Sequence, residues 1–181
     1  MIIFFGPAGA GKSVQAQLLA AQLGWRSLSA GQLLRDSRNS DVLRNMAEGS
    51  LVDNDTVNAI MTQALQRAKS VDTIILDGYP RVVEQAAWLI DSQPSHGRSI
   101  GAAIVLQVPH DELLERLHIR GRLDDSDGAI NERLAIYEEE TNPILDYLKS
   151  QGVQVLEIDG SGSVSDVHQK IVEALTTCKL I

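Results

Sequence analysis

A glycine-rich segment near the start of the chain has the residue types needed to hold phosphate groups. Residues 6–13 read GPAGAGKS, a complete match to the pattern G-x-x-x-x-G-K-[ST]. Glycines in such a loop let backbone N–H groups approach phosphate oxygens, and the first turn of the following helix adds partial positive charge. The Lys12 ammonium can then follow a phosphate that is being transferred, and the Ser13 hydroxyl can bind Mg²⁺. The segment therefore predicts a phosphate site with phosphoryl-transfer chemistry.

A carboxylate further along the chain suits the same metal ion. The apolar run Thr73–Leu76 reads as a buried strand, and Asp77 and Gly78 follow it directly. A carboxylate at the carboxyl edge of a parallel sheet can hold Mg²⁺ through water. An Asp-Gly pair after a strand is by itself an ordinary turn. Asp77 is a candidate metal ligand only because the same chain contains the phosphate loop. We expect Ser13 and Asp77 to contribute to a magnesium site.

Arginines are the third group suited to chemistry on phosphates. Guanidinium groups can stabilise the spread negative charge of a phosphoryl-transfer transition state. Each arginine taken singly is explained as well by a surface ion pair, because Glu112, Asp124, Asp125 and other acidic residues lie near some of them. Together, in an acidic chain, they favour a phosphate site. The candidates are Arg35, Arg81, the i,i+4 pair Arg116 and Arg120, Arg122 and Arg133.

These groups must be positioned by alternating strands and helices. Short, fully apolar runs are typical of strands in a parallel sheet that is covered on both faces. Segments of helical periodicity separate the runs, which implies βαβ units. The stretch from Ser29 to Lys69 reads as helical throughout, as an insertion on the sheet. The predicted strands are Ile2–Phe5, Thr73–Leu76, Ala102–Val108 and Gln154–Ile158.

The first predicted helix follows the phosphate loop. Val14, Leu18, Leu19 and Leu23 have the spacing of one apolar face, and Gly24 is placed to end the helix. A second helix follows Pro109, and a third, longer one is interrupted by Pro143, where we expect a kink.

Bulk properties narrow the class of protein. The 181 residues fit one domain, 1–181, with 44% hydrophobic and 22% charged residues. The formal net charge is -8, so the chain lacks the broad basic surface of a general nucleic-acid binder. From its first residues we expect no signal peptide, and no apolar stretch approaches the length of about 20 residues needed to cross a bilayer. Cys178 is the single cysteine, which excludes an internal disulfide framework and suits a reducing compartment. We expect a cytoplasmic protein without nucleic-acid or membrane partners.

Five segments together resemble the adenylate kinases and their relatives among nucleoside monophosphate kinases. They read GPAGAGKSVQAQLLA, LSAGQLLRDS, EGSLVDNDTV, IILDGYPRVVEQA and RGRLDDSDGAINERLAIYEEETNPILDYL, in order over nearly the whole chain. The DGYPR and R-x-DD…R patterns are more specific than the phosphate loop. The resemblance implies a P-loop α/β fold, a three-layer αβα sandwich with a parallel sheet. It also implies a helical monophosphate-binding insertion at 29–58 and a minimal lid loop at 121–129.

The same resemblance implies an activity and a role for each matched residue. The implied activity is the reversible, Mg²⁺-dependent transfer of a phosphate from ATP to AMP, directly and in line, to give two ADP. The resemblance also implies that the protein is a monomer. Residues matched to catalysis are Lys12, Arg81, Arg120, Arg122 and Arg133. Those matched to ATP are Gly9, Ala10, Gly11, Lys12, Ser13, Val14, Arg116, Arg120 and Gly162. Those matched to AMP are Ala30, Gly31, Arg35, Ser50, Leu51, Val52, Gly78, Tyr79, Pro80, Arg81, Gln85, Arg122 and Arg133.

The chain departs from the family pattern in four places. Ser13-Val14 replaces the usual Gly-Thr after the lysine, Ala30 replaces a threonine, and Gln32 replaces an acidic residue. The segment between Arg120 and Arg122 is very short, even against relatives with short lids. Because this region has no cysteine, a zinc-bearing lid is excluded.

The departures keep other functions open. Ala30 favours UMP or CMP as the acceptor, whereas the Gln85 amide suits an adenine edge and favours AMP. The short lid and Gln32 would also fit a nucleotide-binding regulatory factor whose kinase activity has decayed, but the retained arginines oppose that hypothesis. A GTPase is disfavoured because the chain has no N-K-x-D motif.

Overall fold

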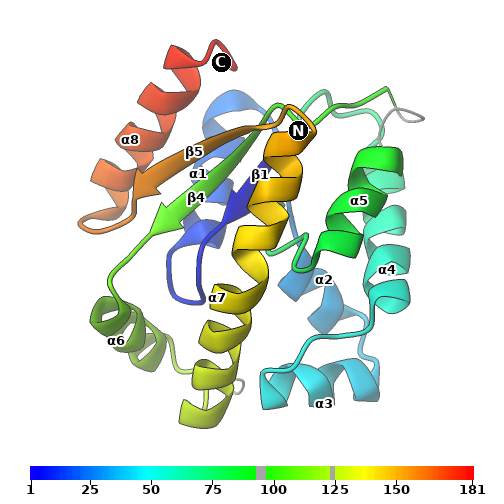
Figure 1. Ribbon diagram of the computed structural model, residues 1–181, viewed down its shortest axis with the longest axis vertical. Coiled ribbons are helices and arrows are strands. Elements are labelled where there is room, and N and C mark those ends of the chain that lie inside the picture. Colours follow the sequence, from blue (N-terminus) through cyan, green and yellow to red (C-terminus); the bar gives the residue numbers. More distant parts are fainter. Residues whose placement is uncertain (93–96, 123–124) are drawn as a thin grey trace.

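The computed structural model describes residues 1–92, 97–122 and 125–181, which form five strands and eight helices (Figure 1). The strands are β1 (Ile2–Phe5), β2 (Arg26–Ser29), β3 (Ile74–Asp77), β4 (Ala102–Gln107) and β5 (Gln154–Asp159). The helices are α1 (Lys12–Leu23), α2 (Ala30–Asp36), α3 (Ser40–Glu48), α4 (Asn54–Arg67), α5 (Val83–Ser92), α6 (His110–Arg120), α7 (Asp127–Ser150) and α8 (Val164–Thr177).

The five strands form one parallel sheet in the order β2-β3-β1-β4-β5. Phe4 in the central strand lies opposite Asp77 of β3 and Ile104 of β4. The carboxyl ends of these strands therefore meet at one edge, where the phosphate loop follows β1 and Asp77 ends β3.

Helices cover both faces of the sheet, which explains why the strands are apolar at successive positions. Ile3 and Phe5 pack with residues of α2, α4, α5 and the second half of α7. Ile2 and Phe4 point the other way and pack with α1, α6 and α8. Alternate side chains of a strand leave opposite faces, so an uninterrupted apolar run fills two cores. The predicted αβα sandwich is confirmed.

β2 was not predicted from the sequence, and the predicted apolar face of α1 was partly wrong. β2 has the sequence RSLS and pairs only with β3 at the sheet edge, and Leu28 is its one buried residue, so no apolar run marks it. In α1, Leu19 is buried as expected, but Val14 and Leu18 are 46% and 39% exposed. Gln15 lies in the buried face of the helix in their place. Gly24 does end α1, in the left-handed conformation.

The insertion predicted at 29–58 and the lid loop predicted at 121–129 both end inside a helix. The insertion at 29–58 contains α2, α3 and the start of α4, where the Asp53 carboxylate accepts a hydrogen bond from the Thr56 N–H at 2.9 Å. Gly121 ends α6, and the Ser126 hydroxyl caps α7, so the predicted lid loop of 121–129 joins two helices and runs into the second. Residues 123–124 of that loop lie outside the described residues. α7 continues through Pro143 as one helix.

No helix in the described parts of the chain combines the length and apolar character needed to cross a bilayer.

Candidate functional site

The phosphate loop runs from β1 into α1 and is packed against α6. Gly9 and Gly11 have φ angles of +86° and +89°, a region that favours glycine. A Cβ on Gly9 would lie 3.0 Å from both the Leu113 carbonyl oxygen and the Leu117 Cγ. The loop can therefore keep its backbone close to α6 only with glycine at position 9.

Lys12 turns back over this loop. Its Nζ donates hydrogen bonds to the Gly6 and Pro7 carbonyl oxygens, at 2.6 and 2.8 Å. Burial lowers the pKa of Lys12 to about 8; Asp77 opposes the shift, and the positive charges of Arg81, Arg120 and Arg133 add to it. Arg81, Arg120 and Arg133 are thus close enough to repel the Lys12 ammonium, and an anion among them would relieve the repulsion.

Ser13 and Asp77, the two expected magnesium ligands, lie in contact. The Ser13 hydroxyl donates a hydrogen bond to Asp77 Oδ2 at 2.5 Å, and Asp77 is 3% exposed. A hydroxyl and a carboxylate fit Mg²⁺, which prefers oxygen ligands and takes few of them from the protein when a nucleotide supplies phosphates. In the described residues, no group of three or more His, Cys, Asp or Glu side chains could hold a metal by itself.

A cavity of about 330 Å³ opens at the carboxyl edge of the sheet and collects most of the predicted residues. Those predicted for ATP are Gly9, Gly11, Lys12, Ser13, Val14, Arg116 and Arg120, and Asp77 lines the cavity as well. Those predicted for AMP are Gly31, Arg35, Ser50, Gly78, Pro80, Arg81, Arg122 and Arg133. Val14 is therefore exposed towards this cavity, which explains why it does not join the core.

A smaller cavity of about 40 Å³ adjoins the first, because the two share Gly31, Met46, Ser50, Gly78 and Arg81. It lies between α2, α4 and α5 and is lined by four further residues predicted for AMP: Ala30, Leu51, Val52 and Gln85.

Three predicted residues line neither cavity. Ala10 is 2% and Tyr79 1% exposed, and the Tyr79 hydroxyl donates to the Asn58 side-chain oxygen at 2.7 Å, so both support the walls from behind. Gly162 lies in the segment before α8 with φ +96°. Arg116 links this segment to α6, because its Nη2 donates to the Gly160 carbonyl at 3.0 Å.

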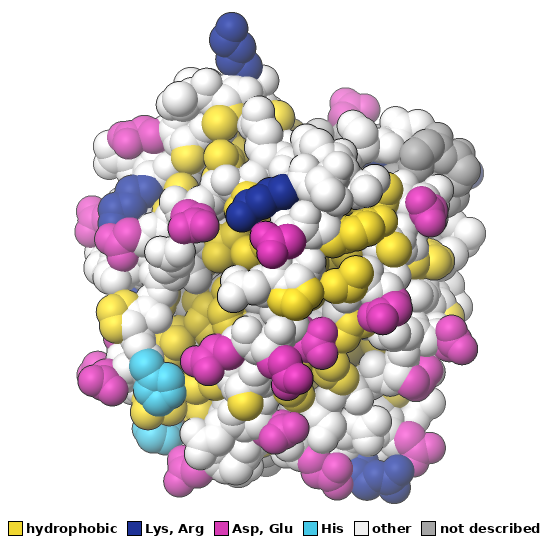
Figure 2. Space-filling model, viewed as in Figure 1, with side chains coloured by type: hydrophobic (Ala, Val, Ile, Leu, Met, Phe, Trp, Pro, Cys, Tyr) yellow, Lys and Arg dark blue, Asp and Glu magenta, His cyan; other side chains and the backbone are white. Residues whose placement is uncertain are grey.

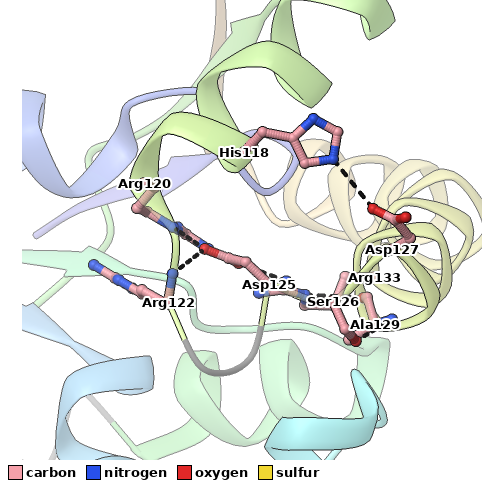
Figure 3. A network of polar contacts seen from close by, with 8 residues as sticks. All are labelled: His118, Arg120, Arg122, Asp125, Ser126, Asp127, Ala129 and Arg133. Atoms are coloured by element: carbon pink, nitrogen blue, oxygen red, sulfur yellow. Dashed lines mark hydrogen bonds and ion pairs between the residues drawn. The ribbon is translucent and has the colours of Figure 1, made fainter.

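Asp125 binds three arginines at the ends of the lid loop, Arg120, Arg122 and Arg133 (Figure 3). The sequence did not predict this role. The Asp125 side chain is 1% exposed and accepts from Arg120 Nε at 2.8 Å and Arg133 Nη2 at 2.8 Å. The Arg122 N–H donates to the same carboxylate at 3.1 Å. One buried carboxylate thus holds the end of α6 against α7. Sequence alone placed Asp125 among the acidic residues available for surface ion pairs.

Replacing Asp125 by alanine is expected to lower the free energy of unfolding at pH 7 by about 2–3 kcal/mol, less than for a wholly buried pair because Arg120 stays partly exposed. Burial alone would raise the pKa of Asp125, but hydrogen bonds from Arg120, Arg133 and the Arg122 N–H outweigh burial and lower it. The stabilisation is therefore complete above the ordinary aspartate pKa of 3.8, declines as the pH falls below it, and is fully lost once the pH has passed through the lower folded-state pKa.

Urea titrations of both proteins at pH 7, 5 and 3 measure this difference. It should be the same at pH 7 and 5 and smaller at pH 3. Asp146→Ala, which removes an exposed carboxylate 3.9 Å from Lys149, is the matched control and should change little. An equally small effect at Asp125 would contradict the buried network.

The charge around the cavity differs from that of the whole chain. On the face shown in Figure 2, acidic side chains are widely spread and lysines and arginines are sparse, in keeping with the net charge of -8. The cavity instead gathers Lys12 with Arg35, Arg81, Arg116, Arg120, Arg122 and Arg133. Such focused positive charge suits a ligand that carries several phosphates.

Comparison with known proteins agrees with this geometry. The family model described as adenylate kinase matches residues 4–153. The chain is 37% identical to an adenylate kinase of Mycobacterium sp. (strain MCS) over 180 residues, covering 96% of this chain and 98% of the relative. It is 36% identical to adenylate kinases of Mycobacterium ulcerans (strain Agy99) and Mycobacterium tuberculosis (strain ATCC 25177 / H37Ra), with the same coverage.

Proposed function

The chain belongs to the adenylate kinase family and is a phosphotransferase of the nucleoside monophosphate kinase type, and on that premise we propose how its cavities divide the reaction. ATP binds on the phosphate-loop side of the larger cavity, and AMP binds on the α2 side with its base in the smaller cavity. The γ-phosphate of ATP passes directly to the AMP phosphate, in line and without a covalent enzyme intermediate, to give two ADP.

The donor side is the loop, Lys12 and α6. The N–H groups at the start of α1 face the triphosphate, and the Lys12 ammonium leaves the Gly6 and Pro7 carbonyls to follow the transferring group. Arg116 and Arg120 come from the neighbouring helix and bind the same phosphates.

The acceptor side is α2 with the segment after β3. Arg35 and Arg81 bind the AMP phosphate and hold its oxygen as the nucleophile. Arg122 and Arg133 approach from the lid side and stabilise the charge that spreads over the transferring group.

The protein residues suited to the metal are Ser13 and Asp77. When bound there with ATP, Mg²⁺ supplies positive charge that neutralises the phosphate oxygens. Asp77 is held for this role by its place at the end of β3 and by the Ser13 hydroxyl.

The observation that carries the proposal is the meeting of Lys12 with Arg81, Arg120 and Arg133 in one cavity, from four separate parts of the chain. Asp125 pairs with Arg120 and Arg133, and Asp77 lies near Lys12. Two carboxylates among these four cations leave an excess of positive charge, which a bound polyanion would offset.

A coupled assay with Mg-ATP and a panel of AMP, CMP, UMP, dAMP and GMP tests the proposal. We expect AMP to be phosphorylated fastest. Faster use of CMP or UMP would keep the fold and mechanism but overturn the acceptor, and Ala30 would then be the first residue to examine. Binding of ATP without use of any acceptor would favour a regulatory protein.

We further propose that the enzyme acts as a monomer in the cytoplasm. The family resemblance supports the monomer, and the single cysteine, Cys178, suits a reducing compartment.

A further inference from the structure

The side chain of Gln85 is held at both ends of its amide. Gln85 is 3% exposed and lines the smaller cavity. Its Oε1 accepts a hydrogen bond from the backbone N–H of Arg81 at 2.8 Å. Its Nε2 donates a hydrogen bond to the side-chain oxygen of Asn54, also at 2.8 Å. Asn54 is the first residue of α4, 31 positions away in the sequence.

These two partners determine which way the amide points. A backbone N–H can only donate, so the atom that faces Arg81 must be the Gln85 oxygen. The Gln85 nitrogen therefore faces Asn54, which must present its own oxygen. A primary amide has two N–H donors and two acceptor lone pairs. The two bonds use one of each, so the Gln85 amide keeps one donor and one acceptor for a ligand.

We propose that Asn54 is a specificity-determining positioning residue, which keeps the Gln85 amide in the orientation that reads a 6-aminopurine. This inference rests on the proposed binding of the AMP base in the smaller cavity. Adenine offers an N–H donor at its 6-amino group and an acceptor at N1, which the remaining acceptor and donor of Gln85 can match. Hypoxanthine, the base of IMP, offers the reverse pattern, with an acceptor at position 6 and a donor at N1.

IMP would therefore need the amide to turn over. Turning it would place the Gln85 NH₂ against the Arg81 N–H, and its oxygen against Asn54. Asn54 could follow only by turning its own amide. Both bonds thus oppose the orientation that favours IMP, and the loss of Asn54 would leave only Arg81 to oppose it. A buried donor facing a donor is costly, so the selectivity should fall and not vanish.

The test compares AMP and IMP as acceptors in wild-type protein and in variants at position 54. Asn54→Leu and Asn54→Ala both remove the acceptor oxygen, one with and one without filling its space. We expect each to raise the KM for AMP by roughly three- to tenfold and to lower the AMP/IMP ratio of kcat/KM by a similar factor. The KM for ATP should not change, since Asn54 does not line the larger cavity, in which ATP is proposed to bind.

Asn54→Asp separates positioning from a general need for asparagine. Aspartate keeps the shape and can only accept, so it cannot follow a turned Gln85. We expect this variant to keep the wild-type AMP/IMP ratio or to exceed it. Asn58→Leu is the matched control, one helical turn further along α4, where the side chain accepts from the Tyr79 hydroxyl. It should lower the melting temperature and leave the ratio unchanged.

Three results would overturn the role of Asn54 while AMP remains the substrate: an unchanged ratio in both Asn54→Leu and Asn54→Ala, a lowered ratio in Asn54→Asp, or an equal fall in Asn58→Leu. Failure of the wild-type protein to use AMP would instead overturn the proposed function, and the inference with it.

Discussion

Lys12→Met should lower kcat/KM for ATP and AMP by about 10³-fold or more, equivalent to about 4 kcal/mol of transition-state stabilisation. The ammonium is the group in the phosphate loop that can move with the transferring phosphoryl group. Methionine keeps the unbranched shape and most of the length of the lysine side chain but not its charge. Because Nζ bonds only to the Gly6 and Pro7 carbonyls within the described structure, its loss should leave the loop folded. The coupled assay measures the loss, and circular dichroism checks the fold.

A second measurement tests whether the Lys12 ammonium contacts the bound phosphates. With a pKa of about 8, Lys12 is partly neutral at pH 8.5, and bound phosphates should raise its pKa and draw in a proton. Calorimetry in buffers of different ionisation enthalpy should therefore show proton uptake on ATP binding at pH 8.5 and little at pH 6.5. Lys12→Met should abolish this uptake, whereas Lys149→Met, at an exposed lysine of α7, should retain it. Equal activity of the two variants would refute the role of Lys12.

Arg133→Ala is expected to lower kcat/KM by about 10²–10³-fold. Arg133 is 13% exposed, and its position is set by hydrogen bonds to Asp125 at 2.8 Å and to the Ala129 carbonyl at 3.0 Å. Because it is already aligned towards the cavity, it can stabilise developing charge without reorganising. Most of the loss should therefore be in kcat, with a smaller rise in KM.

Arg133→Lys tests whether the contribution of Arg133 to activity depends on the planar shape of its guanidinium group or only on its positive charge. Lysine keeps the charge but lacks the planar fork that spans Asp125, Ala129 and a phosphate, so we expect it to recover only a small part of the activity. Arg44→Ala removes an exposed arginine of α3 that pairs with Asp41 at 3.0 Å and should have no effect. If Arg133→Ala kept wild-type kcat, Arg133 would have no part in stabilising the transition state.

The sequence predicted those parts of the fold and site that depend on local pattern. The phosphate loop is contiguous, and β1, β3 and β4 are recognisable as strands because nearly all of their residues are buried. β5 is an edge strand with one buried residue, Ile158, but Val155 and Leu156 add to its apolar pattern. β2 was not predicted because its sequence, RSLS, has no apolar run. Its pairing with β3 makes it a strand, and that pairing cannot be seen in its own composition.

Contacts between distant residues could not be predicted in the same way. Asp125 is one of two adjacent aspartates, and its burial depends on how α6 and α7 bring Arg120 and Arg133 together. The Gln85 amide is oriented by Asn54 on another helix, and no local spacing encodes that bond. The hydrophobic period of α1 was misleading because Val14 faces the cavity and not the core.

Asp125 should also affect the rate at which the product ADP dissociates from the enzyme. The carboxylate acts as a resident counterion for Arg120 and Arg133, so a phosphate that reaches these arginines competes with an anion already in place. The free energy gained on arrival is then the difference between two ion pairs, which is smaller than either alone. Because release of product often limits turnover in enzymes that close over their substrates, we expect this internal competition to shorten the residence of ADP. The same residue that orders the arginines thereby keeps them from holding the product too long.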